Sequence, residues 1–169
     1  LLSGAFDKDT SMHLFFEINK ASERLNRLID NLLNMSRLES GMITPKLDWH
    51  DVHDLVSKVV EVLKNELEKF NLEVSIPDEM PLVKIDFGLI ENVLHNLVLN
   101  ATQYSKPGTT IRIKMYYDHH SFNMQVMDRG PGFPPDELQN VFNKFYRLKG
   151  TISGGTGLGL SIVKGFVQA

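Results

Sequence analysis

The stretch Thr151–Ser161 reads TISGGTGLGLS, and four of the protein's twelve glycines lie within its residues 154–159. Glycine this dense lets a backbone approach another group closely, because no side chain stands in between. Helical spacing resumes at Leu158 and continues to Val167. A glycine run that opens a helix offers free N–H groups and the positive end of the helix dipole, so it suits an anion. Close packing of helix on sheet explains one or two of these glycines, but not all of them.

Two common phosphate-binding fingerprints do not fit this stretch. No Gly-Lys-Ser/Thr follows the glycines at the spacing of a Walker A loop. Gly155, Gly157 and Gly159 are spaced as G-x-G-x-G, whereas the dinucleotide fingerprint needs G-x-G-x-x-G directly after a strand. The glycines therefore predict an anion site of another type, whose ligand must be identified from other residues.

A second candidate site lies in Asn96-Leu-Val-Leu-Asn100. Residues four apart project along one side of a helix, so the two amides lie about one turn apart, at the rim of the apolar stripe, and Tyr104 continues the row. Amide oxygens are hard ligands that suit Mg²⁺, which typically keeps waters and bridges substrate phosphates. Two asparagines on an exposed helix face are the alternative, but asparagine's poor helix propensity favours a functional role.

A third candidate is Asp128, which shares strand parity with Phe122 and Val126, so a regular strand would direct its carboxylate toward the core. A buried carboxylate is costly unless hydrogen bonds are donated to it. At the bottom of an apolar pocket it could accept the exocyclic amine of a purine, while Gly130 and Gly132 let the backbone bend around the ligand. A strand-end aspartate that caps a turn is the alternative.

Composition excludes several classes of function. The 169 residues suit one ordinary domain, or one domain with an appended element, and 42% apolar with 23% charged residues is typical of a globular chain. A formal net charge of −3 gives no electrostatic case for nucleic-acid binding. The chain has no cysteine, which excludes disulfides, cysteine nucleophiles and cysteine zinc sites.

The pattern of residues in the first part of the chain predicts one long helix from Asp9 to Glu39, with Gly41 after its end. About 30 residues would span ~45 Å, longer than a small domain needs. We favour a helical bundle completed by sequence outside this chain or by another chain; a long helix lying on its own domain is the alternative. Apolar residues recur at three- and four-residue steps as in a coiled-coil seam, at Ile18, Ala21, Leu25, Leu28, Leu32 and Met35.

The rest of the sequence alternates helical and strand patterns, so we expect an α+β fold with helices on one face of a mixed sheet. Asp86 is expected to cap a helix that runs to Tyr104. Helices are also expected over 52–70 and 137–145, with strands at 72–76, 82–85, 111–117 and 122–126 and an edge strand around Pro45.

Together, these motifs resemble the ATP-binding domain of sensor histidine kinases, in the superfamily of DNA gyrase, a heat-shock chaperone and mismatch-repair ATPases. The resemblance implies a two-layer α/β sandwich of Bergerat type over residues 42–169, without its C-terminal strands. Residues 1–41 would be the second helix of the dimerisation and phosphotransfer bundle. The four family boxes, in order, are NLVLNA (96–101), DRGPG (128–132), FNKF (142–145) and GTGLGL (155–160).

The resemblance also implies roles for single residues. Asn100 would hold Mg²⁺, with Asn96 beside the phosphates of ATP, and Asp128 would accept a hydrogen bond from the adenine amino group. Arg147 would reach the γ-phosphate and act with Asn96 in catalysis. The expected cofactor-binding residues are Asn96, Asn100, Tyr104, Asp128, Gly130, Gly132, Phe145, Gly155, Thr156, Gly157, Leu158 and Gly159.

Residues 133–154 would form a lid over ATP, with Gly150 and Gly154 as hinges. Gln103 stands where a lysine or arginine is common in the family, which weakens one phosphate contact. In the members that hydrolyse ATP, a glutamate at the position of Asn96 activates water, and an amide cannot take that proton at neutral pH. The γ-phosphoryl group is then kept for the family's acceptor, a histidine imidazole.

The acceptor motif of the family, His-Glu-Leu-Arg/Lys-Thr-Pro, is absent from this chain. His13 does not match it, so we expect the acceptor to lie upstream and this fragment alone not to phosphorylate itself. The other histidines are interpreted as ordinary helix or turn residues, at positions 50, 53, 95, 119 and 120.

The implied function is that of the catalytic region of a two-component sensor kinase, which phosphorylates a histidine and through it an aspartate of a response regulator. We expect a homodimer formed through the helical bundle, and a cytoplasmic position below the plasma membrane of a bacterium. The short lid resembles that of Kdp-type potassium sensors. Two alternatives are an ATP-hydrolysing relative, which Asn96 argues against, and a degenerate scaffold, which Gln103 keeps open.

Overall fold

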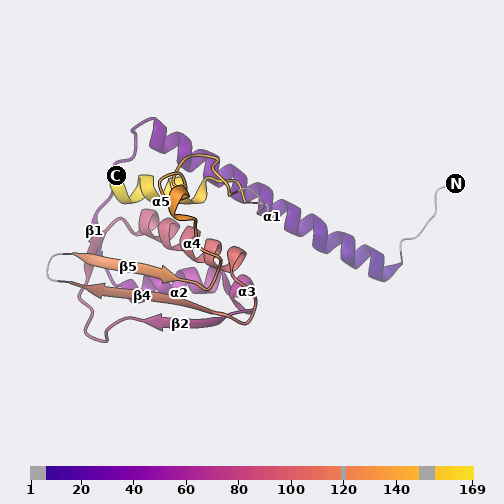
Figure 1. Cartoon of the computed structure of the whole chain (residues 1–169), viewed down its shortest axis with the longest axis horizontal. Coiled ribbons are helices and arrows are strands. Elements are labelled where there is room, and N and C mark those ends of the chain that lie inside the picture. Colours follow the sequence, from indigo (N-terminus) through magenta and orange to yellow (C-terminus); the bar gives the residue numbers. More distant parts are fainter. Residues whose placement is uncertain (1–6, 119–120, 149–154) are drawn as a thin grey trace.

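The computed structural model describes residues 7–118, 121–148 and 155–169 of the chain. Figure 1 shows a layer of strands covered on one face by helices, with α5 and the end of the long helix α1 above them; α1 projects far beyond the rest. The α+β class and the long N-terminal helix are as the sequence predicts.

The main sheet has three strands in the order β2-β4-β5. Strand β2 (Asn71–Ser75) runs parallel to β4 (Thr110–Tyr117), and β4 runs antiparallel to β5 (Phe122–Met127). Along β4 every second side chain is fully buried, at Ile111, Ile113 and Met115, because alternate residues of a strand face opposite sides. The sheet is therefore mixed and has one face toward the core, as predicted.

A separate two-stranded sheet pairs β1 (Asp48–His50) with β3 (Val83–Ile85) in antiparallel register, with Trp49 opposite Lys84. The edge strand expected around Pro45 thus begins three residues later and does not include the proline. The reason is that proline lacks the N–H that a paired strand position must donate.

Three helices cover the inner face of the main sheet: α2 (Val52–Val62), α3 (Lys64–Leu67) and α4 (Phe87–Tyr104). The single helix expected over 52–70 is wrong, because the backbone leaves helical geometry at Leu63 (φ −98°, ψ 18°). Leu63 and Leu67 are both buried in the core all the same, so the apolar periodicity continues across the break.

The remaining two helices form a second core above α4. Helix α5 (Gly159–Gln168) contributes Ile162 and Phe166, and the C-terminal end of α1 (Lys8–Glu39) contributes Met35. Helix α1 approaches α5 closely at Gly165, where a β-carbon would stand only 2.6 Å from Leu38 Cδ1. The end of α1 therefore packs on its own domain, the alternative that the sequence left open.

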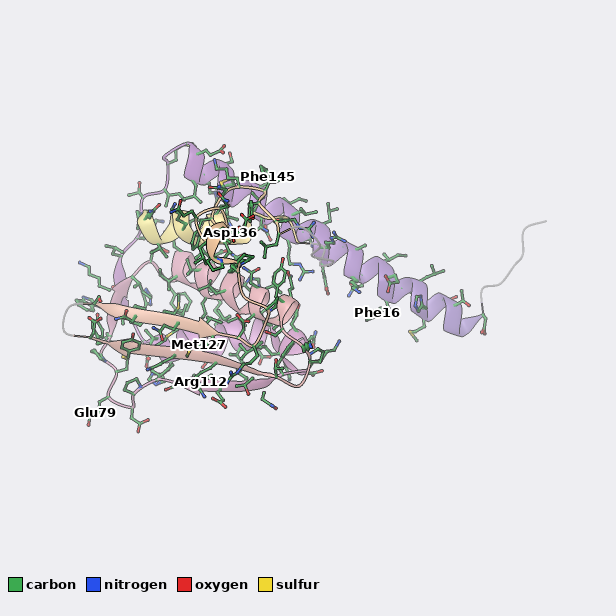
Figure 2. All side chains as sticks on the ribbon, viewed as in Figure 1. Phe16, Glu79, Arg112, Met127, Asp136 and Phe145 are labelled. Atoms are coloured by element: carbon green, nitrogen blue, oxygen red, sulfur yellow. The ribbon has the colours of Figure 1, made fainter. Side chains whose placement is uncertain are left out.

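The first half of α1 stands away from the rest of the molecule, and Phe16 marks this projecting part in Figure 2. Its large apolar side chains are exposed, at Met12, Leu14, Phe15, Phe16 and Ile18. Among the helices of the described ranges, none is long and apolar enough to cross a membrane.

Asp86 begins the helix on which the site is built, and its loss should destabilise the fold. Its carboxylate accepts hydrogen bonds from the backbone N–H of Leu89 (3.0 Å) and of Lys46 (2.7 Å). We expect Asp86→Ala to lower the free energy of unfolding by about 1–2 kcal/mol in urea denaturation, the usual cost of a lost helix cap.

The matched control is Asp78→Ala, at an exposed position in the turn after β2. It should lower the unfolding free energy by less than about 0.5 kcal/mol. Equal effects of the two variants would contradict the capping role of Asp86.

Candidate functional site

Helix α4 carries the polar row that the sequence predicted. Asn96, Asn100 and Tyr104 all face one cavity of about 510 Å³, a volume typical of small-ligand sites. Asn96 is deeper than the predicted rim position, at 7% exposed, and its Nδ2 donates a hydrogen bond to the carbonyl of Asn92 (2.9 Å). Its amide oxygen thereby faces the opposite wall, where a β-carbon on Gly159 would lie 3.1 Å away.

Asp128 lies one residue beyond the end of β5 and lines the same cavity. It accepts hydrogen bonds from the backbone N–H of Gly130 (2.6 Å) and from Ser105 Oγ (3.4 Å). The expectation that its carboxylate is buried is wrong: the side chain is exposed to the cavity, because strand parity no longer applies after Met127. Both hydrogen bonds end on Oδ1 of Asp128. Its Oδ2 is left to accept a hydrogen bond from a ligand.

The glycine segment forms the wall opposite α4, with Gly155, Thr156, Gly157 and Gly159 lining the cavity. Gly157 adopts φ +72°, and a β-carbon there would stand 2.7 Å from the carbonyl carbon of Phe145. Only glycine fits both constraints without strain. The segment leads into α5, whose first N–H groups have no helical partner and suit an anion.

Two of the expected cofactor-binding residues lie outside the lining of the cavity. Leu158 is 1% exposed and belongs to the core beside α5, where its backbone N–H donates to Thr156 Oγ1 (3.1 Å). Phe145 is exposed and adopts φ 61°, an uncommon conformation for a residue with a side chain. Gly130 and Gly132 line the cavity as expected.

The segment before the glycines is a sequence of turns rather than the helix expected over 137–145. A single 3-10 turn covers Pro135–Glu137, and turns follow up to Phe145. The Tyr146 hydroxyl donates a hydrogen bond to Glu137, which raises the pKa of Tyr146 to about 12. Arg147 lines the cavity with its neighbour Tyr146; the expected hinges Gly150 and Gly154 lie outside the described residues.

Helix α1 forms part of the cavity wall, which the sequence analysis missed. Its residues Lys20, Arg24, Arg27 and Asn31 line the cavity, and Asn31 Nδ2 donates a hydrogen bond to Thr156 Oγ1 (3.5 Å). Their spacing of four, three and four residues places them on one face of a helix. The spacing can be read from the sequence, but the sequence around these residues does not show which part of the protein this face of α1 contacts.

His95, next to Asn96 on α4, is half-buried, and burial lowers its pKa below the ordinary value. Within the described ranges, no cluster of three or more histidine, cysteine, aspartate or glutamate side chains is arranged to hold a metal ion. The oxygen donors that the described lining residues offer a metal include the amides of Asn96 and Asn100 and the single carboxylate of Asp128.

Comparison with known proteins shows the family of the part of the chain that holds this cavity. Residues 86–169 match the family described as "Histidine kinase-, DNA gyrase B-, and HSP90-like ATPase". The chain belongs to the sensor histidine kinases, and it carries their ATP-binding catalytic domain. The row on α4, the carboxylate after β5 and the glycine segment all lie within the matched residues.

Individual relatives agree with this assignment. The chain is 35% identical over 166 residues to sensor protein KdpD of Clostridium acetobutylicum, covering 96% of this chain and 18% of the relative. It is 35% identical over 170 residues to the sensor-like histidine kinase SenX3 of Mycolicibacterium smegmatis, covering 97% of this chain and 44% of the relative. The chain thus spans less than half the length of these relatives.

Solved structures show the same architecture. The histidine kinase AdeS of Acinetobacter baumannii superposes with a TM-score of 0.75 and 27% identity, covering 98% of this chain and 76% of that one. Full-length ShkA in complex with AMPPNP superposes with a TM-score of 0.77 over 96% of this chain and 34% of that one; at 21% identity, this likeness concerns the fold alone.

Gly157 should be the glycine least tolerant of a side chain. We expect Gly157→Ala to weaken ATP binding at least tenfold in a fluorescent-nucleotide titration, because the new β-carbon collides with backbone that cannot rotate away. The positive φ alone costs alanine about 1–2 kcal/mol.

Gly108→Ala is the matched control, since Gly108 has φ +83° but nothing within 4 Å of its β-carbon position. The Gly108→Ala variant should have a lower free energy of unfolding but an unchanged affinity for ATP. If Gly157→Ala binds ATP as well as Gly108→Ala does, the close contact with Phe145 has no importance for the site.

Proposed function

We propose that this chain is the catalytic region of an ATP-dependent protein-histidine kinase. It transfers the γ-phosphoryl group of ATP to a histidine on a segment outside residues 1–169, from which an aspartate of a response regulator receives it. Residues 42–169 act as the ATP-binding domain and residues 1–41 as a helix of the phosphotransfer bundle. The supporting observation is that α4, Asp128 and the glycine segment line one and the same cavity.

The polar groups of the cavity suit the parts of ATP. Asp128 has a carboxylate oxygen that can accept from the adenine amino group, and Tyr104 lies beside it in the lining. Asn96 and Asn100 lie close to Gly159 at the N-terminus of α5, where phosphates gain from free N–H groups.

The donor set also fits Mg²⁺, with Asn100 as the protein ligand. Mg²⁺ in phosphate sites commonly takes one or two protein oxygens and completes its shell with phosphates and waters. When bound, the ion neutralises phosphate charge. The described residues of the cavity include no acidic cluster. This fits an ion that takes one amide oxygen from the protein and its other ligands from phosphates and waters.

The residues present favour transfer over hydrolysis. Asn96 stands where a general base would be needed to activate water, and its amide N–H already donates a hydrogen bond to the carbonyl of Asn92. Arg147, from the turn segment, has the charge and reach to stabilise the γ-phosphoryl group during transfer. The turn segment 133–148 would move with it as a lid.

The projecting half of α1 supports a homodimer. Its exposed apolar side chains include Phe15 at 71% and Phe16 at 65%, and an apolar face of this size is typical of a surface that another helix covers. The whole protein is proposed to be anchored in a bacterial plasma membrane with this region on the cytoplasmic side, since its relatives are named as sensor proteins. The likeness to KdpD supports a Kdp-type sensor.

The test uses ATP labelled at the γ-phosphate and a helical hairpin that carries the sequence His-Glu-Leu-Arg-Thr-Pro. The hairpin should become labelled, while the chain alone should neither label itself nor release phosphate. Asn100→Ala should reduce hairpin labelling at least a hundredfold, since the metal and phosphates lose their ligand.

The matched control is Asn65→Ala, which removes an exposed helical asparagine of α3 and should label the hairpin at the normal rate. Self-labelling would show that the acceptor lies within residues 1–169. Release of phosphate without the hairpin would make the chain a hydrolase and would overturn the proposed role of Asn96.

A further inference from the structure

The positive charge around the cavity is divided unevenly between its two sides. Among the described lining residues, three of the four lysine and arginine side chains come from α1, namely Lys20, Arg24 and Arg27, and are here called the basic stripe. The fourth is Arg147, and the one acidic lining residue is Asp128. The ATP-binding domain therefore offers a single cationic side chain from its described part to a ligand with several negative charges.

Contacts with α4, with the glycine segment and with α5 hold α1 beside this cavity. Asn34 Nδ2 donates to Asn92 Oδ1 of α4 (3.5 Å), Asn31 Nδ2 donates to Thr156 of the glycine segment (3.5 Å), and Leu38 packs at Gly165 of α5. These contacts lie on the same side of α1 as the basic stripe, because the residues are spaced by three and four. The stripe is thus aimed at the cavity by the packing of the helix.

The members of the basic stripe differ in their partners. Arg27 Nη1 lies 3.8 Å from Glu66 Oε1 and is partly neutralised. Within the described ranges, neither Lys20 nor Arg24 forms an ion pair or a hydrogen bond, and both are exposed. Like charges four residues apart on a helix repel each other, so an anion between them would relieve a local cost.

We propose that the basic stripe of α1 binds the anionic phosphate tail of the nucleotide, so that the bundle helix forms part of the ATP site. The proposal rests on the proposed function of the cavity as an ATP site. Arginine and lysine bind phosphate through charge-assisted hydrogen bonds, which are about twice as strong as neutral ones.

The residues of α4 that line the cavity explain why positive charge from α1 would be needed. Gln103, one turn after Leu99 on α4, lines the same wall and brings an uncharged amide where a cation would serve the phosphates. The stripe supplies from α1 the charge that α4 lacks.

Docking of α1 and nucleotide binding are then coupled. A ligand that contacts both α1 and the ATP-binding domain favours the arrangement in which they touch, and by linkage the docked arrangement raises the affinity for the ligand by the same factor. Movement of α1 within its bundle would therefore alter how tightly ATP is held.

The experiment compares Arg24→Gln with Arg37→Gln by competition titration of ATP and of adenosine against a fluorescent nucleotide. Both variants remove one positive charge from an exposed position of α1, but Arg37 does not line the cavity. Arg24→Gln should weaken ATP binding about tenfold, the loss expected for one charge-assisted contact, and the Lys20→Gln/Arg24→Gln pair should weaken it further. Arg37→Gln should bind ATP normally, and adenosine affinity should be unchanged throughout.

The outcomes separate this proposal from the one on which it rests. Unchanged ATP affinity in Arg24→Gln, or equal losses in Arg24→Gln and Arg37→Gln, would overturn the role of the stripe, provided that Asn100→Ala abolishes binding. Absence of ATP binding by the unaltered chain would instead overturn the proposed function. An equal loss of adenosine affinity would show a folding defect in place of a phosphate contact, and would also count against the stripe.

Discussion

Helix α4 is held between two apolar cores, and this constraint determines where every polar group of the site can lie. Leu94 and Val98 pack toward the sheet, while Val93 belongs to the core under α1 and α5. The side that remains carries Asn96, Asn100 and Tyr104. Rotating the helix by one residue, about 100°, would exchange apolar side chains for amides in a core, at about 1.5–3 kcal/mol for each apolar group exposed. The register of α4 is therefore fixed by packing, and the site follows from it.

Helix α1 joins two functions in one element. Its C-terminal end packs in the core under α5 through Met35, and its middle lines the cavity that is proposed to bind ATP. Its N-terminal half exposes an apolar face that this chain leaves uncovered in the described residues. A change in how that face packs against other helices would be transmitted along a rigid rod to the cavity wall. If α1 belongs to a helical bundle, as proposed, it connects that bundle directly to the proposed nucleotide site.

Much of this arrangement could be predicted from sequence because local signals agreed with tertiary ones. The helix expected from its Asp86 cap to Tyr104 gave the bounds of α4 correctly, and strand alternation gave β4 and β5. The predictions failed where a pattern was extended past its element. Apolar spacing continued through the break at Leu63, and strand parity was carried one residue beyond β5 to Asp128.

Other features could not be predicted from local patterns at all. The expected helix over 137–145 is replaced by turns in which Phe145 takes a positive φ, close to the backbone of Gly157. The α1 residues that line the cavity meet α4 only through tertiary packing. The most direct test of the account is the crystal structure of this chain with a non-hydrolysable ATP analogue. The account predicts the adenine amino group on Asp128 and the phosphates between Asn100 and the first turn of α5; a purine bound away from Asp128, or phosphates outside that space, would contradict it.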